Sequence, residues 1–184
     1  MKTCQVVDYM GDQVRGSHNL RFKRKDLQNR LDADRCAKIG DTNYVAAITY
    51  FTVKSDNDPG LYHEYTLDDD NRLRNLFWTD YLAQYDYECF ADVLAFDATY
   101  KTNAYHKPLV TFVGTNHHRR TTMFGFAPLG DETVESYTWL LQNCLSAMGN
   151  RKPKSVIIDG DKAMPKASKK VFVGATHRLC YRYL

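Results

Sequence analysis

Two aspartates in the second half of the chain each close a short apolar run. Asp97 follows residues 93–96, and Asp159 follows residues 155–158. If the two runs are neighbouring parallel strands, both carboxylates emerge at one edge of a sheet, where open α/β sheets place their sites. Paired carboxylates favour a hard cation, Mg²⁺ or Mn²⁺, and two such cations can clamp the oxygens of a phosphodiester displacement. A single strand-end aspartate is more often a turn former, so the metal-site hypothesis depends on the pair.

Basic side chains form the second group with recognisable chemistry, because lysine and arginine are the usual contacts to nucleic acid phosphates. The candidate DNA contacts are Lys152, Lys154, Lys162, Lys166, Lys169 and Lys170 around the second aspartate, and the turn residues His117, His118, Arg119 and Arg120. The alternative is that these side chains form an ordinary solvated surface. For the lysines this alternative is slightly favoured over DNA contact, and for the turn residues the two explanations have equal weight. The basic run at residues 21–25 could be a nuclear localisation signal, but an ordinary surface is the more frequent explanation.

His177 and Cys180 lie three residues apart and could be half of a zinc site. Two ligands do not make a structural site, so a core or turn role is favoured. The five cysteines include no Cys-x-x-Cys pair, which indicates a reducing compartment rather than a disulfide framework. The chain shows no signal peptide and no apolar run long enough to span a membrane. With a formal net charge of +3, an intracellular, soluble protein without a membrane partner is expected.

The elements that must position the two aspartates are expected within residues 91–184. After the strand that ends at Asp97, residues 109–115 and 122–127 predict an antiparallel hairpin. The next helix is expected to begin at a capping Asp131 and to end at Gly149. Its apolar face at helical spacing consists of Val134, Tyr137, Leu141, Cys144, Leu145 and Met148.

The strand that ends at Asp159 is followed by a last helix, for which Asp161 is the expected cap and Pro165 lies in the first turn. Three strands, a helix, a strand and a helix are the RNase H order. A right-handed crossover then places the first and fourth strands side by side. The fold class is therefore expected to be α/β, of the α+β type, with an RNase H-like mixed sheet and flanking helices.

A small helical and hairpin region is expected at residues 21–90, after a loose leader at residues 1–20. It is expected to begin with a helix that contains Leu27 and Leu31 and ends near Gly40, followed by a short helix from Asp41 through Phe51. A turn at residues 57–60 then leads into a hairpin of residues 62–67 and 73–78. The last element is a helix capped by Thr79, which carries Tyr81, Leu82, Tyr85 and Phe90.

Several short segments together resemble one known family. They are residues 76–80 (LFWTD), 96–103 (FDATYKTN), 112–118 (FVGTNHH), 131–133 (DET), 158–164 (IDGDKAM) and 177–180 (HRLC). These segments resemble the Mutator-like element (MULE) transposase domain of the plant far-red impaired response proteins, from about residue 20 to the end. The resemblance implies a nuclear transcription regulator derived from a DDE-type transposase. It also implies that Asp97 and Asp159 are ancestral catalytic and metal-binding residues, now inactive.

The sequence departs from the family pattern at three places. The third acid of the DDE triad is expected on a helix further downstream, so the chain is expected to be a fragment truncated before it. The family's Cys-x-x-His becomes Cys180-x-x-Tyr183, which removes a metal ligand, and Ser168 stands where the family tends to place an apolar residue. The family's zinc-dependent DNA-binding domain and SWIM zinc finger are not in this sequence, so zinc is expected only in those modules.

Three functions remain open at this point. The leading hypothesis is a non-catalytic, DNA-associated regulator in the nucleus, with Mg²⁺ or Mn²⁺ bound weakly at the vestigial site. The second is a DDE transposase remnant whose full-length form performs metal-dependent strand transfer. The third is a protein-interaction remnant that forms homodimers or heterodimers with related proteins.

Overall fold

The computed structural model describes residues 42–99, 107–159 and 162–180. The chain divides into two compact units, Met1–Asn43 and Tyr44–Leu184, and every strand named below belongs to the second. The expected leader, the helix with Leu27 and Leu31, the basic run at residues 21–25, Gly40, and the capping roles of Asp41 and Asp161 all fall outside the described residues.

The described part of the chain contains seven strands and four helices. The strands are β1 (Tyr62–Leu67), β2 (Leu73–Thr79), β3 (Val93–Thr99), β4 (Leu109–Thr115), β5 (Thr121–Pro128), β6 (Ser155–Ile158) and β7 (Thr176–Leu179). The helices are α3 (Thr42–Asn57), α4 (Tyr81–Phe90), α5 (Val134–Ala147) and α6 (Ala163–Val171). The element order expected for the second half of the chain is confirmed, and β7 is an addition to it. In this part of the chain no helix is long and apolar enough to cross a membrane.

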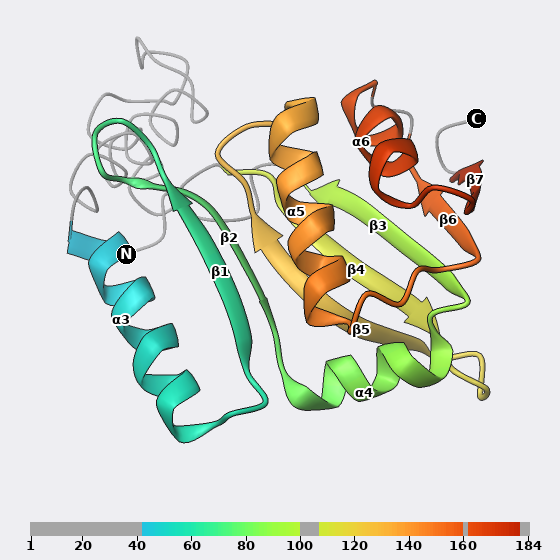
Figure 1. The fold of residues 1–184 in the computed structure, drawn as a ribbon, viewed down its shortest axis with the longest axis horizontal. Helices are drawn as coiled ribbons and strands as arrows, with labels where there is room; N and C mark the ends of the chain where they lie inside the picture. The colour runs from blue at the N-terminus through green and yellow to red at the C-terminus, as the bar shows by residue number, and fades with distance from the viewer. Residues whose placement is uncertain (1–41, 100–106, 160–161, 181–184) are drawn as a thin grey trace, which may run out of the picture. The chain divides into compact units, whose positions relative to one another are not determined.

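The seven described strands form one mixed sheet in the order β1-β2-β5-β4-β3-β6-β7 (Figure 1). From β1 to β3 in that order, each strand is antiparallel to its neighbour. On the other side of β3 the pairing changes, because β3 with β6 and β6 with β7 are parallel. The prediction that the two aspartate-bearing strands are neighbours is therefore confirmed.

One face of this sheet carries the hydrophobic core. Successive residues of a strand point to opposite faces, and in β3 the buried residues are Leu94 and Phe96, while Val93 is exposed. Leu94 and Phe96 share one apolar cluster with Leu141 of α5 and Met164 of α6. Figure 1 shows α5 and α6 side by side over this face. The amphipathic stripe predicted for α5 is confirmed, since its members are buried or packed against the cluster.

The opposite face is covered at β1 and β2 by α3. The Tyr62 hydroxyl of β1 lies 3.4 Å from Oδ1 of Asn143 on α5, so Tyr62 faces the core side. The next residue, His63, points the other way, and its ring stacks on Phe51 of α3 with centroids 5.8 Å apart. Phe51 also contacts the Trp78 ring at 5.2 Å. Helices α3 and α5 therefore lie on different faces of the sheet. Helix α3 is also longer than the short helix expected here.

Aspartate side chains stabilise the turn before β1 and the turn between β1 and β2. Before β1, Oδ1 of Asp58 accepts a hydrogen bond from the Gly60 backbone N–H. Between β1 and β2, Oδ1 of Asp68 accepts from the backbone N–H groups of Asp70 and Arg72. Asn71 takes the left-handed backbone conformation there with φ of 58°, which asparagine tolerates. Both turns were expected, and both are confirmed.

Two helix caps predicted from the sequence are wrong. Thr79 is the last residue of β2, and its hydroxyl donates to the Phe124 carbonyl; Asp80 caps α4 by accepting from the Ala83 N–H. Similarly, Thr133 rather than Asp131 caps α5. Capping requires a β-region backbone at the residue just before the first turn, and sequence alone does not locate that residue to within one or two positions.

At α6 the residue in the cap position is Lys162, which makes no side-chain cap hydrogen bond. Pro165 occupies the first turn, as predicted. The predicted end of α5 is also confirmed: the helix stops at Ala147, and Gly149 follows with φ of 61°.

Candidate nucleic-acid interface and carboxylate pair

Asp97 lies inside β3 rather than at its end, which corrects the sequence prediction. The strand continues to Thr99, and Asp97 is paired with Thr111 of β4. Because Leu94 and Phe96 face the core, Asp97 points to the opposite face of the sheet. The side chain is half-buried, and its Oδ1 atom is shielded from solvent.

Asp159 follows directly after β6, the parallel neighbour of β3. In the parallel pair, Val93 lies opposite Ser155, Leu94 opposite Val156 and Ala95 opposite Ile157, a constant offset of 62 residues. Extended two residues past the last pair, Ala95 and Ile157, the same offset matches Asp159 with Asp97. Side chains alternate between the two faces along β6, and Val156 and Ile158 are buried in the core. If this alternation continues past the end of the strand, the side chain of Asp159 points to the same face as that of Asp97.

Two carboxylates at matched positions of neighbouring strands are a donor set that suits a hard divalent cation. Neighbouring strands lie about 4.8 Å apart, a spacing at which carboxylates at matched positions can share one ion. In the described residues, no group of three or more His, Cys, Asp or Glu side chains is arranged to hold a metal. The pair therefore offers at most two carboxylate ligands from this part of the chain.

Helix α6 presents a basic surface to solvent. Its buried residues are Met164, Ala167, Ser168 and Val171. The side chains on its exposed side are Lys166, Lys169 and Lys170, with Lys162 at the cap position. Between residues 162 and 171 the sequence contains no acidic residue. We call Lys162, Lys166, Lys169 and Lys170 the α6 lysines.

The other predicted DNA contacts lie elsewhere. Lys152 and Lys154 precede β6, at the end of that strand opposite to Asp159, and Lys154 forms an ion pair with Asp92 at 2.8 Å. The structure does not bring these two lysines to the carboxylate pair. The expected single basic surface is thus divided between two ends of the sheet.

The turn between β4 and β5 holds His117, His118, Arg119 and Arg120. Because β4 is antiparallel to β3, this turn also lies at the end of the sheet remote from Asp159. All four side chains are exposed, and the His117 ring contacts Phe90 of α4 at 5.5 Å. Asn116 fixes the turn by accepting from the backbone N–H groups of His118 and Arg120.

His177 and Cys180 are placed by β7, an element that the sequence did not suggest. Nε2 of His177 lies 2.9 Å from the hydroxyl of Ser168, which is fully buried on α6. The backbone N–H of Cys180 donates to the Ile158 carbonyl. The departure at Ser168 therefore has a structural explanation, since its hydroxyl joins α6 to β7. The contact between Ser168 and His177 could not be found by sequence spacing.

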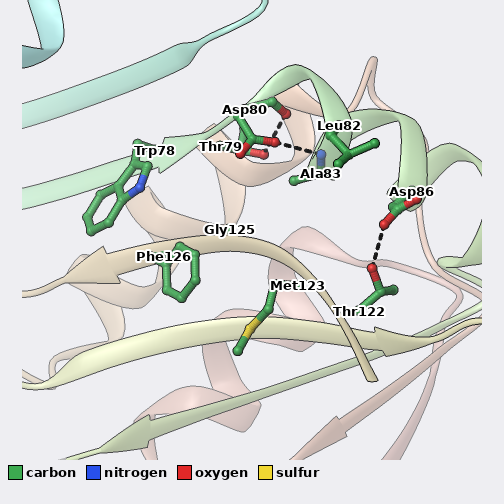
Figure 2. A pocket seen from close by; sticks show the side chains of 10 residues that line it. All are labelled: Trp78, Thr79, Asp80, Leu82, Ala83, Asp86, Thr122, Met123, Gly125 and Phe126. Carbon is green, nitrogen blue, oxygen red and sulfur yellow. Dashed lines mark hydrogen bonds between the residues drawn. The ribbon is translucent and has the colours of Figure 1, made fainter. Parts of the chain in front are cut away.

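A pocket that the sequence analysis missed lies where β2 passes into α4. We call it the α4 pocket; the residues that define its character are Trp78, Asp80, Leu82, Asp86, Met123 and Phe126. Figure 2 shows the residues of α4 opposite those of β5, with Trp78 of β2 at one end and the hydrogen-bonded Asp86 and Thr122 at the other. The pocket encloses about 280 Å³. The sequence contains no hydrophobic pattern that predicts this pocket, because its walls come from three different elements.

Comparison with known proteins identifies the family of this chain. Residues 93–184, which contain the carboxylate pair and the α6 lysines, match the MULE transposase domain. The chain belongs to the MULE transposase domain family, and the resemblance stated from sequence motifs is confirmed.

The most similar relatives include three proteins of Arabidopsis thaliana. Protein FAR1-RELATED SEQUENCE 7 is 35% identical over 153 residues, which are 83% of this chain and 20% of that protein. Protein FAR-RED IMPAIRED RESPONSE 1 is 34% identical over 177 residues, 96% of this chain and 21% of that protein. Protein FAR1-RELATED SEQUENCE 5 is 32% identical over 176 residues, 96% of this chain and 22% of that protein. The chain spans about a fifth of the length of these relatives. No solved structure matches significantly.

Proposed function

We propose that this chain is the transposase-derived core of a nuclear transcription regulator of the far-red impaired response type. In this proposal the core has an RNase H-like fold, associates with DNA through phosphate contacts and does not cut DNA. The non-catalytic role rests on relatives whose names refer to an impaired far-red response and not to transposition. Nuclear localisation and pairing with a related protein belong to the same proposal.

The observation that carries the DNA association is the set of α6 lysines on the exposed side of that helix. The lysines are exposed and have no acidic neighbours along the helix. A surface of this kind replaces the counterions of a phosphate backbone, and the release of those counterions drives most non-specific binding. Contacts to phosphates position a protein on DNA but do not read its sequence. We therefore expect binding without sequence preference.

The test is a fluorescence anisotropy titration of labelled duplex DNA at two or more salt concentrations. The wild-type chain should bind with a dissociation constant of roughly 10⁻⁴ to 10⁻⁶ M. The double variant Lys166→Ala/Lys169→Ala should bind every duplex more weakly and should reduce the slope of log K against log salt by about 1.8.

Lys54→Ala/Arg72→Ala is the matched control, since it removes two exposed positive charges far from α6 in the sequence and should retain the wild-type slope. Equal losses in the two double variants would show that only net charge matters and would remove the support for a DNA-binding surface on α6. A preference for one duplex that persists at high salt would show base reading instead.

The matched register of Asp97 and Asp159 favours a second candidate function, metal-dependent strand cleavage. Two metal ions with a complete acid set are needed to stabilise both oxygens of the displacement. On the leading proposal, the purified chain does not nick supercoiled DNA with Mg²⁺ or Mn²⁺. Nicking that is abolished by Asp97→Asn would establish the second function and contradict the first.

A further inference from the structure

The α4 pocket has apolar walls that continue onto an exposed rim. The rings of Trp78 and Phe126 stack with centroids 5.6 Å apart and an interplanar angle of 25°. At the mouth, Leu82 is 67% exposed and Met123 is 49% exposed. Tyr85 lies three residues after Leu82, so it is on the same side of α4, and it is 54% exposed. These exposed apolar side chains are gathered around one hollow, and grouped apolar surface of this kind is a feature of interaction sites.

The charged groups in the pocket are both acidic. Its lining includes the carboxylates of Asp80 and Asp86 and no lysine or arginine. Asp80 is held by the Ala83 N–H at 2.8 Å, and Asp86 is held by the Thr122 hydroxyl at 2.6 Å. A carboxylate offers about four lone-pair sites, so each of these two can accept further hydrogen bonds. Two oriented carboxylates in a pocket lined by no basic side chain are complementary to a cation.

Arginine fits this combination better than other cations. Its guanidinium pairs with carboxylates through a rigid fork of donors, while its stem covers apolar surface. The hollow of about 280 Å³ is slightly smaller than ordinary small-molecule sites of roughly 300–1,000 Å³, and it suits one large side chain. The exposed rim at Leu82, Tyr85 and Met123 needs a larger covering group, which a peptide segment supplies.

The acidic lining separates this surface from the proposed DNA contacts. The α6 lysines attract phosphates, whereas Asp80 and Asp86 repel them. The two surfaces also belong to different parts of the sheet, because α4 follows β2 and packs on β5, while α6 follows β6. A partner can therefore occupy the pocket while DNA contacts α6.

We propose that the α4 pocket is a docking site for a partner protein segment that presents one arginine flanked by apolar side chains. The arginine pairs with the carboxylates of the pocket, Asp80 and Asp86, and its apolar neighbours cover Leu82 and Met123. This site is additional to the proposed DNA association and does not depend on it.

The probe is a fluorescein-labelled peptide of sequence Gly-Leu-Arg-Leu-Gly, titrated with the full chain and followed by anisotropy. A second peptide carries citrulline in place of arginine, which keeps the shape and removes the charge. The arginine peptide should bind saturably and at least about tenfold more tightly than the citrulline peptide, a ratio that corresponds to one carboxylate–guanidinium contact. Equal affinity of the two peptides, or no binding of either, overturns the proposal.

The protein variants test the location. Asp80→Asn/Asp86→Asn removes both charges, retains an acceptor for Thr122 and preserves the α4 cap, because asparagine caps as well as aspartate. We expect it to weaken the arginine peptide about tenfold. Asp56→Asn/Asp69→Asn removes two exposed charges outside the pocket and should leave the affinity unchanged. Equal weakening by both double variants contradicts docking in the pocket.

Met123→Arg places a cation at the pocket mouth from an exposed position and tests the site without changing the cap. It should reduce arginine-peptide binding by a similar factor. Wild-type affinity in this variant would contradict the proposal. The wild-type chain is also titrated with labelled oligothymidylate. If it binds this oligonucleotide tightly but not the arginine peptide, and if Met123→Glu abolishes the oligonucleotide binding, the pocket is a nucleic-acid site instead.

Discussion

Asp131 shows how one residue can be important in a role that its sequence position does not suggest. Its Oδ1 accepts hydrogen bonds from the hydroxyls of Thr133 at 2.7 Å and Ser136 at 2.6 Å, and its Oδ2 pairs with Arg74 at 2.9 Å. Partial burial acts to raise the pKa of Asp131, but the hydrogen bonds from Ser136, Thr133 and Arg74 outweigh it and hold the pKa well below its ordinary value. The residue thus connects β2 to the start of α5.

Asp131→Asn should lower the free energy of unfolding at pH 7 by about 1 kcal/mol, a figure reduced for the partial exposure of the pair. A carboxyl whose pKa is lowered by folding stabilises the native state above its unfolded pKa, near 3.8, and loses that contribution as pH falls towards the folded value. The difference between wild type and variant should therefore shrink below about pH 4. Urea unfolding at pH 7 and pH 3 measures it, with Asp69→Asn as an exposed control. An equal difference at both pH values would contradict the ionic explanation.

At the scale of elements, the strand pairing could be predicted, but several element ends could not. The apolar runs before Asp97 and Asp159, together with the handedness of crossovers, were sufficient to make β3 and β6 parallel neighbours. Strand β7 was missed because its four residues include two that are charged or titratable, His177 and Arg178, and most of the strand is exposed. It is held by parallel pairing with β6 and by the hydroxyl of Ser168, which are contacts with distant parts of the chain.

The pairing of β3 with β6 leads to a prediction about metal binding. Since the strand register brings the carboxylates of Asp97 and Asp159 level, the chain should bind Mn²⁺ weakly, with a dissociation constant on the order of 10⁻³ M, as expected for few ligands. In calorimetry, Asp159→Asn should abolish this binding. Asp92→Asn, which removes a carboxylate just before β3, should leave the binding intact. An unchanged titration in Asp159→Asn would mean that the aligned aspartates have a structural role only.

At the scale of the whole molecule, basic and acidic side chains are grouped on different surfaces, which the overall composition does not reveal. The net charge of +3 suggests a nearly neutral surface, yet the α6 lysines and the acidic α4 pocket lie on different elements. The sequence revealed the lysines because they are close together along the chain. It did not reveal the pocket, because Trp78, Asp86 and Met123 come together only when β2, α4 and β5 assemble.

The same assembly buries a thiol that can report on global unfolding. Cys144 has no solvent exposure and belongs to the core cluster, whereas Cys89 on α4 is exposed. Burial raises the pKa of the Cys144 thiol to about 12, and only the thiolate reacts with alkylating reagents. Cys144 therefore becomes reactive only when the core opens.

In iodoacetamide labelling at pH 8, resolved by peptide mass spectrometry, Cys89 should react in the native protein. Cys144 should react at least about 10³-fold more slowly, in line with the unfolding equilibrium of a small domain. With increasing urea, labelling of Cys144 should rise together with the loss of circular dichroism, since both follow the same core. The variant Cys89→Ser controls for unfolding caused by the first adduct and should leave the protection of Cys144 unchanged. Labelling of Cys144 at the rate of Cys89 in the absence of urea would show that α5 separates from the sheet without global unfolding, so that the core is not one cooperative unit.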